Sequence, residues 1–154
     1  MPVAGHIAAA VTRILTGAIA RVARLNAEPD RGVILYGNAQ TNRAWQVLLA
    51  KSPVQVFNAR VRIGGREVTG EDLACLFIQP RLGSDRALVG VVSGTGLPGM
   101  RLTEYLPYFI SGVGYPDCIL LGSETLRTEA AGVRAAGFFG EDWGIDSGEF
   151  VWRK

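Results

Sequence analysis

The sequence predicts an α/β fold: a Rossmann-like sandwich with a mainly parallel central sheet, an added β-hairpin and an N-terminal amphipathic helix. Short continuous apolar runs alternate along the chain with segments whose apolar residues recur at helical spacing. The apolar runs are typical of strands in a sheet that helices cover on both faces. The chain has 154 residues, of which 48% are hydrophobic and 19% are charged. This composition indicates a domain with a substantial core, and it excludes intrinsic disorder and a coiled coil.

Residues 1–26 are expected to form an amphipathic helix and its linker. Its apolar stripe consists of Ile7, Val11, Ile14, Leu15, Val22 and Leu25, opposite Arg13, Arg21 and Arg24. The stripe has three candidate destinations: its own domain, a second copy of the chain, or a membrane surface. Because burying one such side chain is worth roughly 1.5–3 kcal/mol, we expect residues 7–25 to join copies into a homo-oligomer, most simply a dimer.

A single domain is expected over residues 27–154. Residues 32–36 form a continuous apolar run, which predicts a buried strand, and residues 41–50 follow with helical spacing and a Thr41 N-cap. From Val54 the apolar period changes to two, and Gly64-Gly65 separates two alternating runs. That pattern predicts a tight hairpin.

The second half of this domain predicts three further strands, two helices and an aromatic tail. We expect strands over 73–78, 87–92 and 118–121, helices over 98–109 and 123–136, and a tail over 137–154 that covers an edge or face of the sheet. Pro107 should end or bend the first of these helices. Since strands 33–36, 87–92 and 118–121 are apolar without alternation, they are predicted to be central, neighbouring and parallel.

A glycine-rich turn follows the strand at 87–92. Its glycines, Gly94, Gly96 and Gly99, stand between a strand and a helix, as in the dinucleotide-binding fingerprint. Glu124 lies near the position of a ribose-binding acid. However, this strand comes late in the domain, and Pro98 removes one amide that a phosphate would use. A nucleotide site, another anion site and a merely tight turn all remain open here.

Polar residues follow two of the apolar strands. Asn38, Thr41 and Asn42 follow the first, and Ser93 and Thr95 end the later one. If these strands are parallel, the polar groups meet in one crevice. The sequence therefore predicts Ser93 and Asn38 as catalytic, and it predicts ligand binding by Thr41, Asn42, Gly94, Thr95, Gly96 and Gly99. The same residue types also cap helices and close turns.

Several other classes of site have little support. The only histidine is His6, far in sequence from any candidate nucleophile, so a Ser–His–Asp relay is not predicted. Cys75 and Cys118 lie inside apolar runs and are expected to be free buried thiols, which leaves no zinc site. The sequence predicts no metal site and no resident cofactor, although a divalent metal and a nucleotide both stay open.

Charge and hydropathy limit the partners and the location. The formal net charge of +2 does not indicate a nucleic-acid partner. No apolar stretch reaches the length of a transmembrane segment, and the N-terminus lacks the pattern of a signal peptide. A cytoplasmic location is therefore expected.

The chain also resembles a known family. The strings DRGVILYGNAQTNRAWQVLL, LACLFIQPRLGSDRALVGVVSGTGLPGMRL, YFISGVGYPDCILL and GVRAAGFFGEDW resemble the carboxyl-terminal region of large bacterial hydrolase-like proteins of the prolyl-oligopeptidase or esterase type. The resemblance begins near residue 27. It implies an appended α/β domain, because the serine hydrolase machinery of those proteins lies upstream, and no triad residue carries over.

Three functions are consistent with these observations. The first is a hydrolase-derived module that is non-catalytic and acts through packing or by binding a polar ligand. The second is a small hydrolase of activated esters or phosphoesters, with Ser93 and Asn38 at its site. The third is nucleotide binding through Gly94, Gly96 and Gly99.

Overall fold

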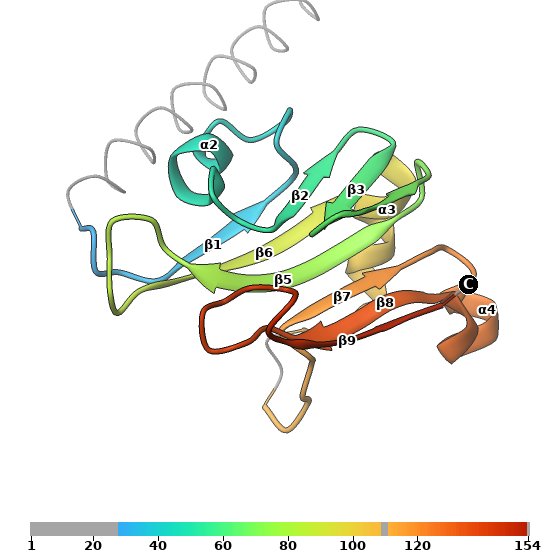
Figure 1. Cartoon of the computed structure of the whole chain (residues 1–154). Coiled ribbons are helices and arrows are strands. Elements are labelled where there is room, and N and C mark those ends of the chain that lie inside the picture. The colour runs from blue at the N-terminus through green and yellow to red at the C-terminus, as the bar shows by residue number, and fades with distance from the viewer. Residues whose placement is uncertain (1–27, 109–110, 154) are drawn as a thin grey trace, which may run out of the picture. The chain divides into compact units, whose positions relative to one another are not determined.

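The computed structural model describes residues 28–108 and 111–153 (Figure 1). The chain divides into two compact units, Met1–Arg31 and Gly32–Lys154. The predicted helix over residues 1–26 and its pairing through residues 7–25 lie outside the described residues. In the part of the chain that is described, no helix is long and apolar enough to cross a membrane.

The first half of the larger unit forms one strand of the main sheet and a separate small sheet. Its elements are β1 (Val33–Tyr36), α2 (Ala44–Leu49), β2 (Val54–Phe57), β3 (Arg60–Ile63) and β4 (Arg66–Thr69). Strands β2, β3 and β4 pair antiparallel in that order. The predicted Gly64-Gly65 hairpin is confirmed, because β3 and β4 pair on either side of it, and Gly64 has the positive φ of 57° that the turn needs.

The second half supplies the remaining strands of the main sheet. Its elements are β5 (Ala74–Pro80), β6 (Leu88–Gly94), α3 (Leu97–Leu102), the 3-10 helix η1 (Thr103–Tyr105), β7 (Cys118–Leu121), α4 (Thr125–Thr128), η2 (Glu129–Gly132), β8 (Val133–Phe138) and β9 (Glu149–Trp152). Strands β5 and β6, which correspond to the strands predicted over 73–78 and 87–92, pair antiparallel as a wide hairpin. Pro107 also acts as predicted, since Leu106 before it is extended and ends the helical turns.

The predicted Rossmann-like α/β sandwich is wrong. The described chain is mostly β, with nine strands and only three short α-helices. The six-stranded sheet has the order β1-β6-β5-β7-β8-β9, and among its described pairings only β1 with β6 is parallel. Figure 1 shows this mixed sheet running from blue β1 to red β9. Each strand beyond the β1–β6 pair is antiparallel to its neighbours.

The expected neighbours of the three apolar strands are also wrong. Strand β5 lies between β6 and β7, and β1 is an edge strand. Ile34 and Tyr36 of β1 are 50% and 52% exposed. An apolar run without alternation predicts cover on both faces, but the described residues cover only one face of β1. Its direction is still that of β6 and β7, because β6 and β7 both run antiparallel to β5.

The long helix predicted over residues 123–136 is replaced by two short helices and a strand. Helix α4 ends at Thr128 and η2 ends at Gly132, where an added Cβ would collide with Thr125. Residues 133–138 then form β8, which pairs with β7, and the aromatic tail supplies the edge strand β9. Local helical spacing was therefore overridden by the hydrogen bonds that the free edge of β7 offers to a second antiparallel neighbour, β8.

The six-stranded sheet has two different faces. Facing residues of paired strands share a face, and residues alternate along each strand. One face, which we name the core face, carries Cys75, Phe77 and Val91. Trp45 of α2 packs edge-to-face on Phe77, with ring centroids 6.0 Å apart. The buried valines and isoleucine of the small sheet add to this core; they are Val54, Val56, Val61 and Ile63.

The described residues cover the opposite face only in part. We name it the open face; its residues on β1, β5 and β6 are Ile34, Tyr36, Leu76, Ile78, Gly90 and Val92. At one end, Leu102 of α3 and Leu106 pack against Ala74 and Leu121. This cover does not reach β1, because Ile34 and Tyr36 are each about half exposed. The open face therefore leaves apolar sheet surface accessible.

Candidate functional site

Asn38, predicted to be catalytic, lies at the centre of a closed hydrogen-bond network. Its side-chain amide donates to the Gly94 carbonyl and to Asn58 Oδ1, both at 3.0 Å. Its Oδ1 accepts the backbone amides of Gln40 and Thr41, at 3.0 and 3.1 Å. Asn38 is only 3% exposed. All polar atoms of this side chain are thus used to join the end of β1 to the end of β6 and to the β2–β3 turn.

Thr41 and Asn42 serve the same connection. The Thr41 hydroxyl accepts the Asn38 amide at 2.8 Å, so Thr41 closes the turn after β1 instead of capping α2. Asn42 Nδ2 donates to the Tyr36 carbonyl at 2.8 Å, and its Oδ1 accepts the Ala44 amide at 2.9 Å. The structure therefore brings Asn38 and Thr41 together with Gly94, as predicted from the sequence. The hydrogen bonds between them connect segments of the chain and form no ligand site.

The glycine-rich turn after β6 is explained by close packing of the backbone. A Cβ at Gly94 would collide with the Met100 amide, and one at Gly99 would collide with the Leu73 carbonyl. At Gly96 it would lie 2.7 Å from the Glu71 carbonyl. Thr95 fastens the turn, since its hydroxyl accepts the Leu73 amide at 3.1 Å and its own amide donates to the Leu73 carbonyl at 3.0 Å. The glycines let this turn approach the residues that precede β5.

The side chain of Ser93, the other residue predicted to be catalytic, lies on the core face of the sheet. It is 0% exposed, and its facing residue on β5 is Cys75. Its Oγ has no hydrogen-bond partner in the described structure. A nucleophile must reach its substrate, and this hydroxyl is enclosed. The geometry gives Ser93 no access to a substrate and gives Asn38 no unused donor.

The two cysteines are free and buried on the same face of the sheet. A hydrogen bond with the Cys118 thiol and burial both raise the pKa of the Cys75 thiol well above its usual range. The thiolate is the reactive form of cysteine, so a raised pKa makes Cys75 inert. These thiols are core residues, as predicted.

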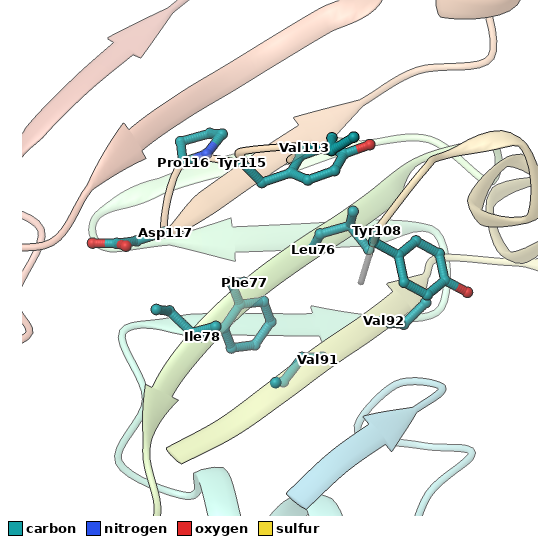
Figure 2. A pocket seen from close by; sticks show the side chains of 11 residues that line it. Leu76, Phe77, Ile78, Val91, Val92, Tyr108, Val113, Tyr115, Pro116 and Asp117 are labelled. Carbon is teal, nitrogen blue, oxygen red and sulfur yellow. The ribbon is translucent and has the colours of Figure 1, made fainter. Parts of the chain in front are cut away.

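A cavity of about 250 Å³ opens on the opposite side of the sheet, at the open face. Its floor is formed by β5 and β6, and residues after Pro107 stand around it. Figure 2 shows the side chains of Tyr108, Val113 and Tyr115 above Leu76 and Val92. Asp117 also lines the cavity, but its Oδ2 accepts the Phe139 amide at 3.2 Å. The interior is therefore mainly apolar, with two phenol groups in its wall.

The tyrosines were not predicted as site residues from the sequence, although most of them lie at one site. The chain has four tyrosines, and three of them, Tyr36, Tyr108 and Tyr115, belong to the open face or to the wall of its cavity. Burial raises the pKa of Tyr108, and the neighbouring Tyr36 raises it further. Burial also raises the pKa of Tyr115. The phenols of Tyr108 and Tyr115 therefore stay protonated at neutral pH.

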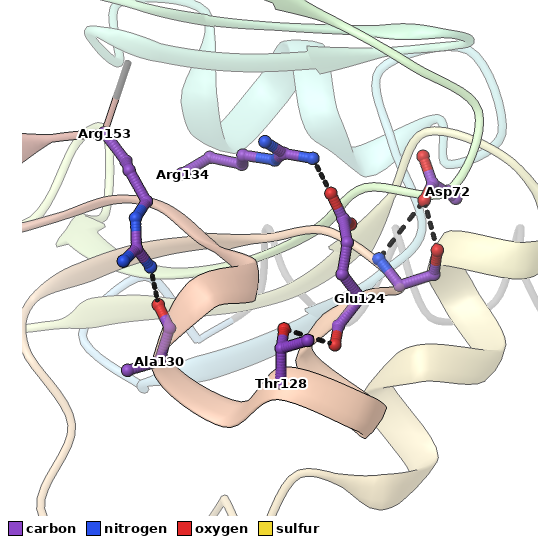
Figure 3. Close-up of polar contacts among 7 residues, drawn as sticks. Asp72, Glu124, Thr128, Ala130, Arg134 and Arg153 are labelled. Atoms are coloured by element: carbon purple, nitrogen blue, oxygen red, sulfur yellow. Dashed lines mark hydrogen bonds and ion pairs between the residues drawn. The ribbon is translucent and has the colours of Figure 1, made fainter.

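A polar cluster joins the segment before β5 to the segment after β7 (Figure 3). Asp72 Oδ2 accepts both the amide and the hydroxyl of Ser123, and the hydroxyl bond lowers the pKa of Asp72 while burial opposes it. Glu124 pairs with Arg134 of β8. The ion pair with Arg134 holds Glu124 against β8. This pairing accounts for an acidic residue at position 124, so binding of a ribose is not needed to explain it. Among the described residues, no group of three or more His, Cys, Asp and Glu side chains could hold a metal ion.

No family model, no curated protein and no solved structure matches this chain. The function must therefore be argued from the site itself.

Replacing Gly99 by alanine tests the packing role of the turn. The new Cβ would meet the Leu73 carbonyl, which is backbone and cannot rotate away. We expect Gly99→Ala to lower the free energy of unfolding by roughly 1–3 kcal/mol, measured by urea denaturation. Gly65→Ala is the matched control, since nothing lies within 4 Å of its added Cβ. Equal stability of the two variants would contradict the packing role.

Asn38 and Ser93 should respond in opposite ways to alanine. Asn38→Ala leaves the buried Gly94 carbonyl and the Gln40 amide without their partner, so we expect a loss of roughly 2–4 kcal/mol in the free energy of unfolding. Ser93→Ala removes a buried hydroxyl that has no partner, and stability should stay equal or rise. Asn58→Ala, an exposed position, should cost much less than Asn38→Ala. A clearly destabilised Ser93→Ala would show that the hydroxyl has a role this geometry lacks.

Proposed function

We propose that the domain is a non-catalytic, hydrolase-associated module that binds a partner protein through the open face of its six-stranded sheet. The observation that carries the proposal is the apolar surface left uncovered toward β1, where Ile34 and Tyr36 are about half exposed. Beside it lies the cavity of about 250 Å³ over β5 and β6. Exposed apolar surface next to a cavity is typical of an interaction site.

The residue types around this cavity fit a protein partner. Tyrosine offers a large apolar ring with a polar tip and is enriched at interfaces. Tyr36, Tyr108 and Tyr115 provide three such rings around a floor that includes Leu76 and Val92. A cavity of this size accepts a single apolar side chain as an anchor, which would pack against these rings. The resemblance to hydrolase-like proteins suggests the partner: a hydrolase catalytic domain.

Catalysis by the domain itself receives less support from the geometry. The hydrolase alternative needs Ser93 or Asn38 at an accessible site, and both are enclosed. The nucleotide alternative needs Gly94, Gly96 and Gly99 to approach a phosphate, whereas each of them already faces a backbone atom of this chain. The hydrolase alternative is kept as an outcome of the ester and phosphoester assay below.

The open face can be tested with Nile red, a neutral dye that fluoresces in apolar sites. We expect the chain to enhance its fluorescence, and Ile34→Thr and Tyr36→Thr to reduce this binding several-fold, because each removes apolar surface beside the cavity. Val47→Thr is the control, since Val47 is exposed to a similar degree on α2. If none of the three substitutions changes the binding of the dye, the open face is not the binding site.

The same preparations should be assayed with chromogenic esters and phosphoesters. The proposal expects no turnover that depends on Ser93 or Asn38. If Ser93→Ala lowered kcat by about a hundredfold, as loss of a catalytic group does, the small hydrolase would replace the module as the function.

We also propose that the chain forms a homo-oligomer, most simply a dimer, through residues 7–25. The support is the apolar stripe that these residues form at helical spacing, too large to leave in water. Light scattering of the intact chain at micromolar concentration should report a dimer, and deletion of residues 1–25 should give a monomer or an insoluble product. A monomeric intact chain would contradict this assembly.

A further inference from the structure

Strand β9, red in Figure 1, forms the second edge of the six-stranded sheet, at the end opposite β1. It pairs with β8 on one side without a register shift, and no described strand pairs with its other side. The outer side of such a strand is a row of backbone donors and acceptors that can pair with another strand. The four residues of β9 include no lysine, proline or bulge that would block this pairing.

The hydrogen bonds to β8 determine which backbone groups of β9 face outward. The Arg153 amide donates to the Arg134 carbonyl at 3.0 Å, so the backbone of Arg153 is directed toward β8. Successive residues of an antiparallel strand direct their N–H and C=O groups to opposite sides. The N–H and C=O groups of Phe150 and Trp152 therefore point away from the sheet, and within the described chain they have no backbone partner.

Side chains on the core face hold β9 in place, while the centre of the strand stays accessible. Phe150 packs on Phe139, with ring centroids 5.5 Å apart, and the Arg66 guanidinium of β4 lies 4.8 Å from the centre of the Trp152 ring. Val151 lies on the open face, in line with its facing residues on β8, β7 and β5. It is 76% exposed, the largest fraction among the described large hydrophobic residues. The edge is thus fixed in position and uncovered.

The residue types of β9 are self-complementary. From its start, β9 and the residue that follows it are acidic, aromatic, valine, aromatic and basic. If the outer sides of two copies pair antiparallel around Val151, Phe150 of each copy faces Trp152 of the other, and their outward backbone groups exchange hydrogen bonds. In the same register, Glu149 of each copy faces Arg153 of the other. Aromatic pairs and opposite charges that face each other across strands both stabilise the pairing.

The two charges favour a second copy as the partner and select this register. Glu149 and Arg153 are both exposed, and they lie roughly 13 Å apart along the strand, at about 3.3 Å per residue, so they cannot pair within one copy. One nitrogen of Arg153 donates to the Ala130 carbonyl, which is neutral and leaves the positive charge in place. No described ion pair involves Glu149. A register centred on Phe150 would place Glu149 opposite Val151 and lose both charge pairs.

We propose that two copies of this chain associate through β9, with antiparallel pairing centred on Val151. The six-stranded sheet of each copy then continues into that of the other across a two-fold axis. The contact is small, so it is weak and forms at high protein concentration. It is separate from residues 7–25 and from the cavity of the open face, and it does not depend on the functions proposed for them.

A cysteine at the centre of the contact tests this pairing. Facing residues without mutual hydrogen bonds have Cα atoms about 4.5 Å apart, a separation that a disulfide can bridge. We expect Val151→Cys in the full chain, at submillimolar concentration with oxidised glutathione, to form a disulfide-linked dimer on a non-reducing gel. Val47→Cys, at an exposed position of α2, is the matched control and should cross-link much more slowly. The natural Cys75 and Cys118 are 0% exposed and should not react. Equal rates for the two variants would overturn the proposal.

Charge exchange tests the register. Glu149→Arg in the Val151→Cys chain places like charges opposite each other at both ends of the contact, so it should slow cross-linking several-fold. Adding Arg153→Glu restores opposite charges with their positions exchanged, and it should restore the rate. Both positions are exposed, so the variants should fold, which their thermal unfolding curves check. If Glu149→Arg leaves the rate unchanged, or if the double exchange fails to restore it, β9 does not pair in this way.

This assembly and the one proposed through residues 7–25 are tested separately. Light scattering at micromolar concentration measures the contact made by residues 7–25, whereas cross-linking at position 151 measures the contact made by β9. A chain that is monomeric in light scattering but cross-links at position 151 with the expected charge dependence would contradict the first assembly and support the second.

Discussion

The fold depends on how closely the backbone packs where β6 ends. At this point Gly94, Gly96 and Gly99 let the turn into α3 touch residues 71–73, and Thr95 bonds to both backbone groups of Leu73. Asn38 attaches the end of β1 to the Gly94 carbonyl. The Ala59 amide, in the β2–β3 turn, donates to the Thr95 carbonyl at 2.8 Å. One short segment thereby connects both sheets and α3.

This junction determines where function can reside. The polar groups that make it are buried and bonded to each other, so they have little capacity left for a ligand. Accessible chemistry lies elsewhere, in two cavities of different character. The one at the open face is apolar and bordered by tyrosines, whereas the one beside Trp143 has charged side chains of both signs in its wall.

The candidate site was predictable only in part. The sequence placed Asn38, Thr41 and Gly94 close together, and the structure agrees, because β1 is parallel to β6 and both strands end at the same edge. It did not reveal that the amide of Asn38 would be used up by Gly94 and Asn58. Asparagine has the same local signature in a turn and in a ligand site, and only the surrounding atoms distinguish the two roles. Arg81 and Trp143 are distant in sequence, so their common cavity had no local signal.

By itself, the sequence determined the features that depend on neighbouring residues. These include the positions of β1, β5, β6 and β7, the Gly64-Gly65 turn, the end of the helical segment before Pro107 and the burial of both cysteines. Only the tertiary structure decided that β5 separates β6 from β7, that residues 133–138 pair with β7 as a strand, and that β1 stands at an edge. The physical reason is that turn geometry and side-chain periodicity are local, whereas strand order depends on hydrogen bonds and packing between distant segments. An apolar run shows that a strand packs against something, but not how many of its faces are covered.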